Sequence, residues 1–151
     1  MAYVSQDMKK QLAPGIKAVL KKYGMKGSIA IDNHSSLCVN LKSGDIDFES
    51  QCGVNERGDR LGYDAVDGKY YTDVNPYWFS KSKYYDENTI AFLTELFAAM
   101  KAPCKDWNGE EREWYDNSDA MTDYFDIKYY VNVRVGRWDK GYTYTGKALA
   151  A

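Results

Sequence analysis

The sequence contains few of the residues that usually bind metals or act as nucleophiles. Its 151 residues include one histidine, His34, and three cysteines, Cys38, Cys52 and Cys104. The cysteines are widely separated, and no CxxC or Cys/His spacing of a structural zinc site is present. We therefore expect free thiols in a reducing compartment. Cys38 lies in an apolar alternating run and is predicted to be buried, whereas Cys52 and Cys104 lie in polar stretches and are candidates for exposed thiols.

Long apolar runs are also missing. The chain begins MAYVSQDMKKQL, without the apolar core of a signal peptide. No segment approaches the roughly eighteen apolar residues of a membrane span. The expectation is a cytoplasmic protein with no membrane partner. Its length fits a single domain over 1–151, which buries about two-thirds of the surface that the unfolded chain exposes.

Charge is nearly balanced overall but unevenly distributed. The net charge is −2. Lysine and arginine dominate the segments 1–27 and 127–151, so the middle of the chain carries most of the carboxylates, concentrated in 45–73 and 106–126. If the basic ends do not neutralise these segments in space, the acidic face would repel nucleic acid and attract basic partners.

Aromatic residues are abundant. They make up 15% of the chain, with 14 tyrosines, 5 phenylalanines and 4 tryptophans, which is more than a small core normally needs. Two interpretations stay open. The excess forms a binding surface, because Tyr and Trp combine a large contact area with a polar group, or the rings pack along the edge of a sheet.

The first third of the chain predicts a helix followed by a hairpin. Apolar residues recur at helical spacing from about Ser5 to Tyr23. Pro14 is expected to divide this run into a short helix, a kink and a better helix that ends at Gly24. The alternating runs 28–32 and 36–41 predict two strands joined by a turn. His34 then lies exposed at the turn, without a second metal ligand.

The next part is less regular. Residues 43–44 predict a second turn, and 46–48 predict the start of a third strand. Residues 49–73, with scattered glycines among charges, predict a long loop. The aromatic run YYTDVNPYWF, residues 70–79, predicts a strand that Pro76 confines to the edge of a sheet.

A second helix and a last strand complete the expected fold. Residues 86–100 predict a helix with Asp86 or Asn88 as its cap and Pro103 as its stop. Its apolar stripe consists of Ile90, Leu93, Leu96, Phe97 and Met100. Residues 127–135 alternate strictly, as a half-buried strand requires, and the tail 143–151 is expected to fray. The order predicts an α+β fold: a mainly antiparallel sheet of about four or five strands, with two principal helices packed on one face.

Three stretches carry a resemblance to a known family: IKAVLKKYGMKGSIAIDNHSSLCVNLKSGDIDF (16–48), VNPYWFSKSKYYDENTIAFLTELFAAMKA (74–102) and YDNSDAMTDYFDIKYYVNVRVGRWDKGY (115–142). Taken in order, they resemble a small domain of tailed phages and other mobile elements, the large polyvalent protein associated domain. Section 49–73 fits least well and is expected to be a variable insertion. The resemblance implies an accessory role in establishing the element in a host. It carries no catalytic residues.

A row of carboxylates is the strongest candidate for a metal site. Asp116, Asp119 and Asp123 share one face if the segment is helical, and hard oxygen ligands suit Mg²⁺ or Ca²⁺. The order of a calcium-binding loop is absent, however, and the neighbouring Asn, Ser and Thr residues suit turns and helix caps. Structural capping is therefore the prediction, with no metal and no cofactor.

The leading hypothesis is a non-enzymatic phage or mobile-element accessory protein that binds a host protein, in counter-defence. Its partner site is predicted in the acidic, aromatic-rich middle, where aromatic anchors suit protein recognition. That site comprises Tyr70, Tyr71, Tyr77, Trp78, Trp107, Trp114, Asp116, Asp119 and Asp123. The alternative is a nucleic-acid-binding accessory protein, which would use Lys81, Lys83, Arg134 and Arg137. Under either hypothesis, the protein is expected to be a monomer or a small homo-oligomer.

Overall fold

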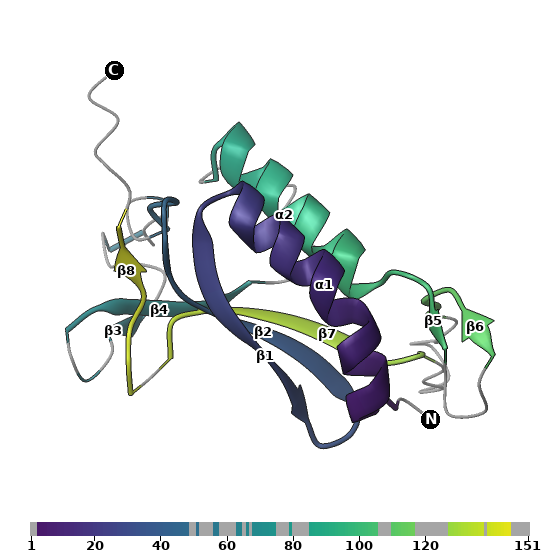
Figure 1. The fold of residues 1–151 in the computed structure, drawn as a ribbon. Helices are drawn as coiled ribbons and strands as arrows, with labels where there is room; N and C mark the ends of the chain where they lie inside the picture. Colours follow the sequence, from purple (N-terminus) through teal and green to yellow (C-terminus); the bar gives the residue numbers. More distant parts are fainter. Residues whose placement is uncertain are drawn as a thin grey trace.

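The computed structural model describes residues 3–48, 51, 56–57, 63–64, 66, 68–74, 79, 85–105, 110–116, 127–137 and 139–145. In this part of the chain two helices lie on the same face of a mixed sheet (Figure 1). The predicted α+β class, with a mainly antiparallel sheet and two helices on one face, is confirmed. The sheet also contains parallel pairs, which connect strands far apart in the sequence.

The first helix, α1, is one continuous element from Gln6 to Lys22, so the predicted break at Pro14 is wrong. Ser5 caps its start and Gly24, with a φ of +67°, follows its end. An internal proline costs a helix about 3 kcal/mol. The buried stripe continues on both sides of the exposed Pro14 and holds the helix on the sheet, with Met8, Leu12, Ile16 and Leu20 all buried.

The predicted hairpin is present with longer strands. Strand β1 (Met25–Asp32) pairs antiparallel with β2 (Ser36–Gly44), and Ile29 lies opposite Val39. Asn33 and His34 form the tip with positive φ values of 51° and 61°. The turn predicted at 43–44 is wrong, because these residues belong to β2.

Strand β7 (Tyr130–Val135) lies beside β2 and runs parallel to it, although more than 80 residues separate them in sequence. Its other neighbour is β4 (Tyr70–Val74), which also pairs with the short β3 (Tyr63–Asp64). The order along the sheet is therefore β1-β2-β7-β4-β3. Strands β3 and β4 both include residues of the loop predicted at 49–73.

The end of the chain returns to β2. Strand β8 (Thr143–Tyr144) pairs parallel with Ser43 and Gly44, beyond the point where β7 has left β2. The predicted frayed tail is therefore wrong at 143–144. Residues 146–151 of that tail lie outside the described residues.

Helix α2 (Glu87–Met100) confirms the predicted second helix, with Asp86 as its cap. Its buried face is slightly rotated from the predicted stripe, since Thr89 and Phe92 are buried and Ile90 is half-buried. The strand predicted at 46–48 is absent, but both of its apolar side chains are in the core. Strands β5 (Cys104–Lys105) and β6 (Glu111–Arg112) form a small separate sheet. Within the described residues, neither helix is long and apolar enough to cross a membrane.

Candidate binding surfaces

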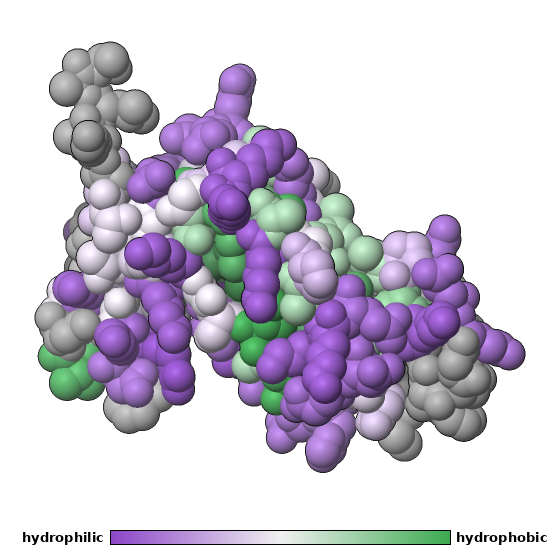
Figure 2. Space-filling model, viewed as in Figure 1, coloured by the Kyte–Doolittle hydropathy of each residue, from purple (hydrophilic) through white to green (hydrophobic). Residues whose placement is uncertain are grey.

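An open groove lies along the line where α1 and β1 meet. Its volume is about 500 Å³, and Figure 2 shows hydrophobic surface between these elements with hydrophilic side chains on both sides. Leu20 and Met25 provide the apolar floor, and three lysines provide the only charges among the described residues of the lining. The lining residues are Lys17, Leu20, Lys21, Gly24, Met25, Lys26 and Gly27.

The groove borders an edge of the sheet. Strand β1 is first in the strand order, and no other described strand pairs with its outer side (Figure 1). The run Ser28–Ile31 contains neither a charge nor a proline, the devices that commonly protect edge strands from pairing. Its side chains are half-buried. An extended peptide could therefore add to β1 through main-chain hydrogen bonds.

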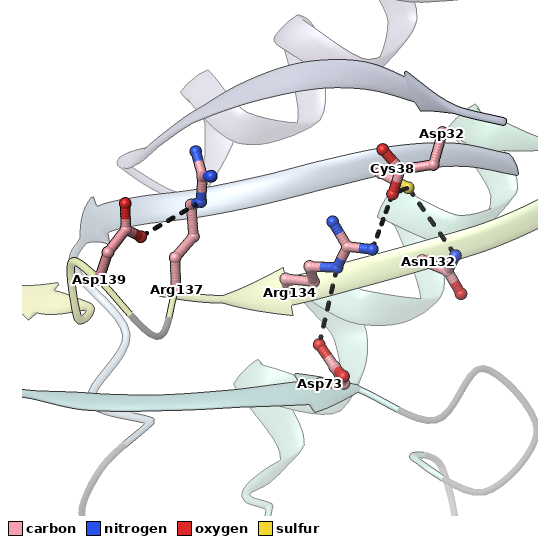
Figure 3. Close-up of polar contacts among 7 residues, drawn as sticks. All are labelled: Asp32, Cys38, Asp73, Asn132, Arg134, Arg137 and Asp139. Atoms are coloured by element: carbon pink, nitrogen blue, oxygen red, sulfur yellow. Dashed lines mark hydrogen bonds and ion pairs between the residues drawn. The ribbon is translucent and has the colours of Figure 1, made fainter. Parts of the chain in front are cut away.

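The sheet face opposite the helices carries a polar network at its centre (Figure 3). Arg134 Nη2 lies 2.8 Å from Asp32 Oδ2, and Arg134 Nε lies 3.9 Å from Asp73 Oδ1. The Cys38 thiol donates to Asp32 Oδ2 at 3.3 Å, while the Asn132 amide contacts Cys38 Sγ at 3.8 Å. These contacts join β1, β2, β7 and β4 across the sheet.

The electrostatics of this network favour a structural role. The hydrogen bond from Arg134 lowers the pKa of Asp32, with the Cys38 hydrogen bond as the second cause. Burial, followed by the Asp32 contact, raises the pKa of Cys38. Cys38 therefore stays a thiol near neutral pH, and nucleophilic catalysis by cysteine requires the thiolate. The prediction that Cys38 is buried is confirmed.

The predicted aromatic partner site is only partly supported by exposure. Tyr70 is 3% exposed and belongs to the core, so its assignment to a partner surface is wrong. Tyr71 is half-buried and Asp116 is exposed, where it forms an isolated bridge with Ile127. Trp114 is half-buried against the core, and its Nε1 donates to the Tyr129 carbonyl at 2.8 Å.

Several predicted residues cannot be placed in this arrangement. Those outside the described residues are Tyr77, Trp78, Trp107, Asp119 and Asp123 of the partner site and Lys81 and Lys83 of the nucleic-acid alternative. The carboxylate row therefore remains a prediction. Among the residues that the structure describes, no three His, Cys, Asp or Glu side chains gather in a way that could hold a metal ion. Cys104, a candidate exposed thiol, is 1% exposed, so that prediction is wrong.

The two described arginines of the nucleic-acid alternative both have carboxylate partners. Arg134 contacts Asp32 and Asp73, and Arg137 Nε lies 3.6 Å from Asp139 Oδ1 (Figure 3). Arg134 is therefore held by two carboxylates within the sheet face, whereas Arg137 has one carboxylate partner and an exposed side chain just beyond β7.

Sequence reasoning missed the groove between α1 and β1. Lys21 and Lys22 lie in the last turn of α1, where positive charge complements the helix dipole, so lysines at these positions do not by themselves indicate a groove. To find the groove, one must know which strand lies at the edge of the sheet. The identity of that strand depends on β7 inserting beside β2, a pairing between distant segments that local patterns do not encode.

A scan against protein-family models finds no match for this chain. Searches of curated proteins and of solved structures likewise return no significant match.

Proposed function

We propose that this protein acts by binding another protein, and that an extended acidic segment of the partner adds to the outer edge of β1. One observation carries the proposal: an edge strand, whose run Ser28–Ile31 has no charge, proline or bulge, lies beside a groove with an apolar floor and a basic rim. Main-chain hydrogen bonds would supply affinity, and the groove would select side chains. No catalytic step is part of this function.

The charge of the groove favours an acidic partner segment. Lys17, Lys21 and Lys26 line it, and no carboxylate is among the lining residues. Complementary charge mainly accelerates association and excludes wrong partners, whereas the apolar floor contributes affinity. The proposed ligand is thus an extended segment that alternates acidic and apolar side chains.

Nucleic acid is the second candidate, because the same lysines could contact phosphates. The described residues of the groove lining include no aromatic ring on which a base could stack, and stacking rings are the usual complement of a positive groove that binds single strands. A polypeptide can pair with the free strand edge and place apolar side chains on the apolar floor, whereas a nucleic acid cannot form the strand pairing. We therefore rank the protein partner first.

The nature of the partner rests on the family resemblance. A domain of phages and mobile elements acts inside a host, so we propose that the partner is a host protein and that the complex counters a defence of the host.

A peptide library tests the binding mode. Ten-residue peptides of graded acidic content are displayed, selected on the immobilised protein and measured by fluorescence anisotropy. We expect selection of acidic and apolar alternation, and affinity that falls between 0.05 and 0.5 M salt because exposed charges are screened.

Matched charge reversals on one helix provide the control. Lys17→Glu lies in the groove and should weaken the selected peptides about tenfold, whereas Lys10→Glu makes the same charge change on an exposed position outside the lining. Equal effects of the two substitutions would contradict the proposal. Selection of no peptide, together with tight salt-sensitive binding of single-stranded DNA, would reverse the ranking of the two candidates.

A further inference from the structure

A second hollow lies where β7 leaves β2 and β8 takes its place. It has a volume of about 190 Å³, below the roughly 300–1,000 Å³ of pockets for drug-sized ligands. Its lining shares no residue with the groove beside β1. Four cationic side chains and one carboxylate surround it, namely Lys42, Lys69, Arg137, Lys140 and Asp139.

The charge of this hollow contrasts with the net charge of the whole chain. The whole chain has a net charge of −2, yet the lining carries three more positive charges than negative ones. Asp139 lies 3.6 Å from Arg137, and Lys69 Nζ donates to Thr143 Oγ1 at 2.9 Å. These contacts hold two of the cations in place. Lys69 lies just before β4, and Arg137 lies just after β7. Such convergence suits a compact anion.

One wall of the hollow contains an unsatisfied polar group. Asn40 is 8% exposed and lines the hollow, and its Oδ1 has no hydrogen-bond partner among the residues that the structure describes. Leaving a buried acceptor unpaired is costly, so most buried polar groups find a donor. A carbonyl oxygen accepts hydrogen bonds and cannot donate them. A ligand that presented an N–H or O–H to this side chain could supply the missing donor.

These two features point to different parts of one ligand. A phosphate monoester carries a charge of about −1.5 to −2 at pH 7, which matches the excess of cations. A fully ionised phosphoryl group offers acceptors only, so it cannot satisfy Asn40 Oδ1. A hydroxyl on the organic part of the ligand can do so.

We propose that the hollow between β2, β7 and β8 binds a small phosphate monoester with free hydroxyl groups, such as a sugar phosphate. Lys42, Arg137 and Lys140 contact the phosphoryl oxygens, and Asn40 accepts from a hydroxyl. A hollow of this size favours one phosphoryl group over a nucleic-acid backbone, which needs a groove that follows successive phosphates. The site does not depend on the function proposed for β1.

Three probes separate the two contributions: ribose 5-phosphate, inorganic phosphate and ribose. In ¹H–¹⁵N NMR titrations of the full chain, ribose 5-phosphate should bind at least tenfold more tightly than either of the others. The amides of 40–42 and 136–143 should shift most. Lys140→Glu, at an exposed position, should weaken ribose 5-phosphate about tenfold, whereas Lys10→Glu should leave its affinity unchanged.

Asn40→Leu tests the hydroxyl contact, because it has a similar size and no acceptor. In this variant the affinity for ribose 5-phosphate should fall to that for inorganic phosphate. Equal binding of these two ligands by the natural protein, or an equal effect of Lys140→Glu and Lys10→Glu, would overturn the proposal. A single-stranded oligonucleotide that bound more tightly than ribose 5-phosphate would overturn it in favour of a nucleic-acid site.

Discussion

Replacing Trp114 with alanine separates a structural side chain from a partner anchor. The indole packs against the core while remaining half-buried. Its Nε1 donates to the Tyr129 carbonyl at 2.8 Å, and Lys101 Nζ lies 4.2 Å from its ring. We expect Trp114→Ala to lower the free energy of unfolding by about 4 kcal/mol.

The magnitude follows from the contacts. About half of an aromatic surface of roughly 200 Å² is buried, which contributes about 2.5 kcal/mol. The hydrogen bond to Tyr129 and the contact with Lys101 each contribute about 1 kcal/mol. Compaction of the unfolded chain reduces the first contribution. Trp114→Phe keeps most of the ring and the Lys101 contact, so it should cost only about 1–2 kcal/mol.

Urea unfolding measures these differences. Both variants should lower the midpoint without changing the slope m, and Trp114→Ala should lower it at least one and a half times as far. The same proteins are then titrated with a peptide selected for the β1 groove. Its affinity should be unchanged, because Trp114 does not line that groove. A stable Trp114→Ala protein that had lost its partner would refute the reasoning and restore the anchor hypothesis.

Three further predictions concern other parts of the fold. Gly15→Ala should stabilise by about 1 kcal/mol in urea unfolding, since no atom lies within 4 Å of the added Cβ, whereas Gly24→Ala should destabilise because that Cβ would lie 2.0 Å from Asp45 Oδ2. Asp32 has a lowered pKa in the folded protein, so its stabilisation is present above the unfolded pKa near 3.9 and is lost as pH falls through the folded pKa. Asp32→Asn should make the free energy of unfolding depend less on pH in that acidic range, and an unchanged pH dependence would contradict this. Native Cys38 should resist iodoacetamide at pH 8 while the urea-unfolded chain is alkylated, as measured by peptide mass spectrometry; rapid native labelling would contradict its burial.

The helices and the hairpin could be predicted because their signals are local. Asp86 and its helix, and the alternation around His34, depend on residues within one element. The exception is Pro14, whose penalty is outweighed by packing on both sides of it. A local rule for a helix breaker cannot include the burial supplied by the rest of the molecule.

The arrangement of the sheet could not be predicted, and with it the candidate sites. The parallel pairing of β7 with β2, which leaves β1 at the edge, joins distant segments. The polar sequence around Tyr70 favours a surface position, yet Tyr70 is buried. It pairs with Asp64 of β3, and the Tyr142 amide donates a hydrogen bond to its carbonyl oxygen. Likewise, the sequence indicates only that Asn40 lies in a strand. It does not show that β7 separates from β2 nearby and leaves a hollow that Asn40 lines.

Hydrogen exchange of β1, with and without a selected acidic peptide, reports directly on whether the peptide adds to this strand. Outward-facing main-chain amides of Gly27–Asp32 should exchange quickly in the free protein, because no described strand pairs with them. Peptide binding should protect these amides in an alternating pattern, and Lys17→Glu should weaken the protection at a fixed peptide concentration. Protection confined to other segments, with β1 unchanged at saturating peptide, would contradict this mode of binding.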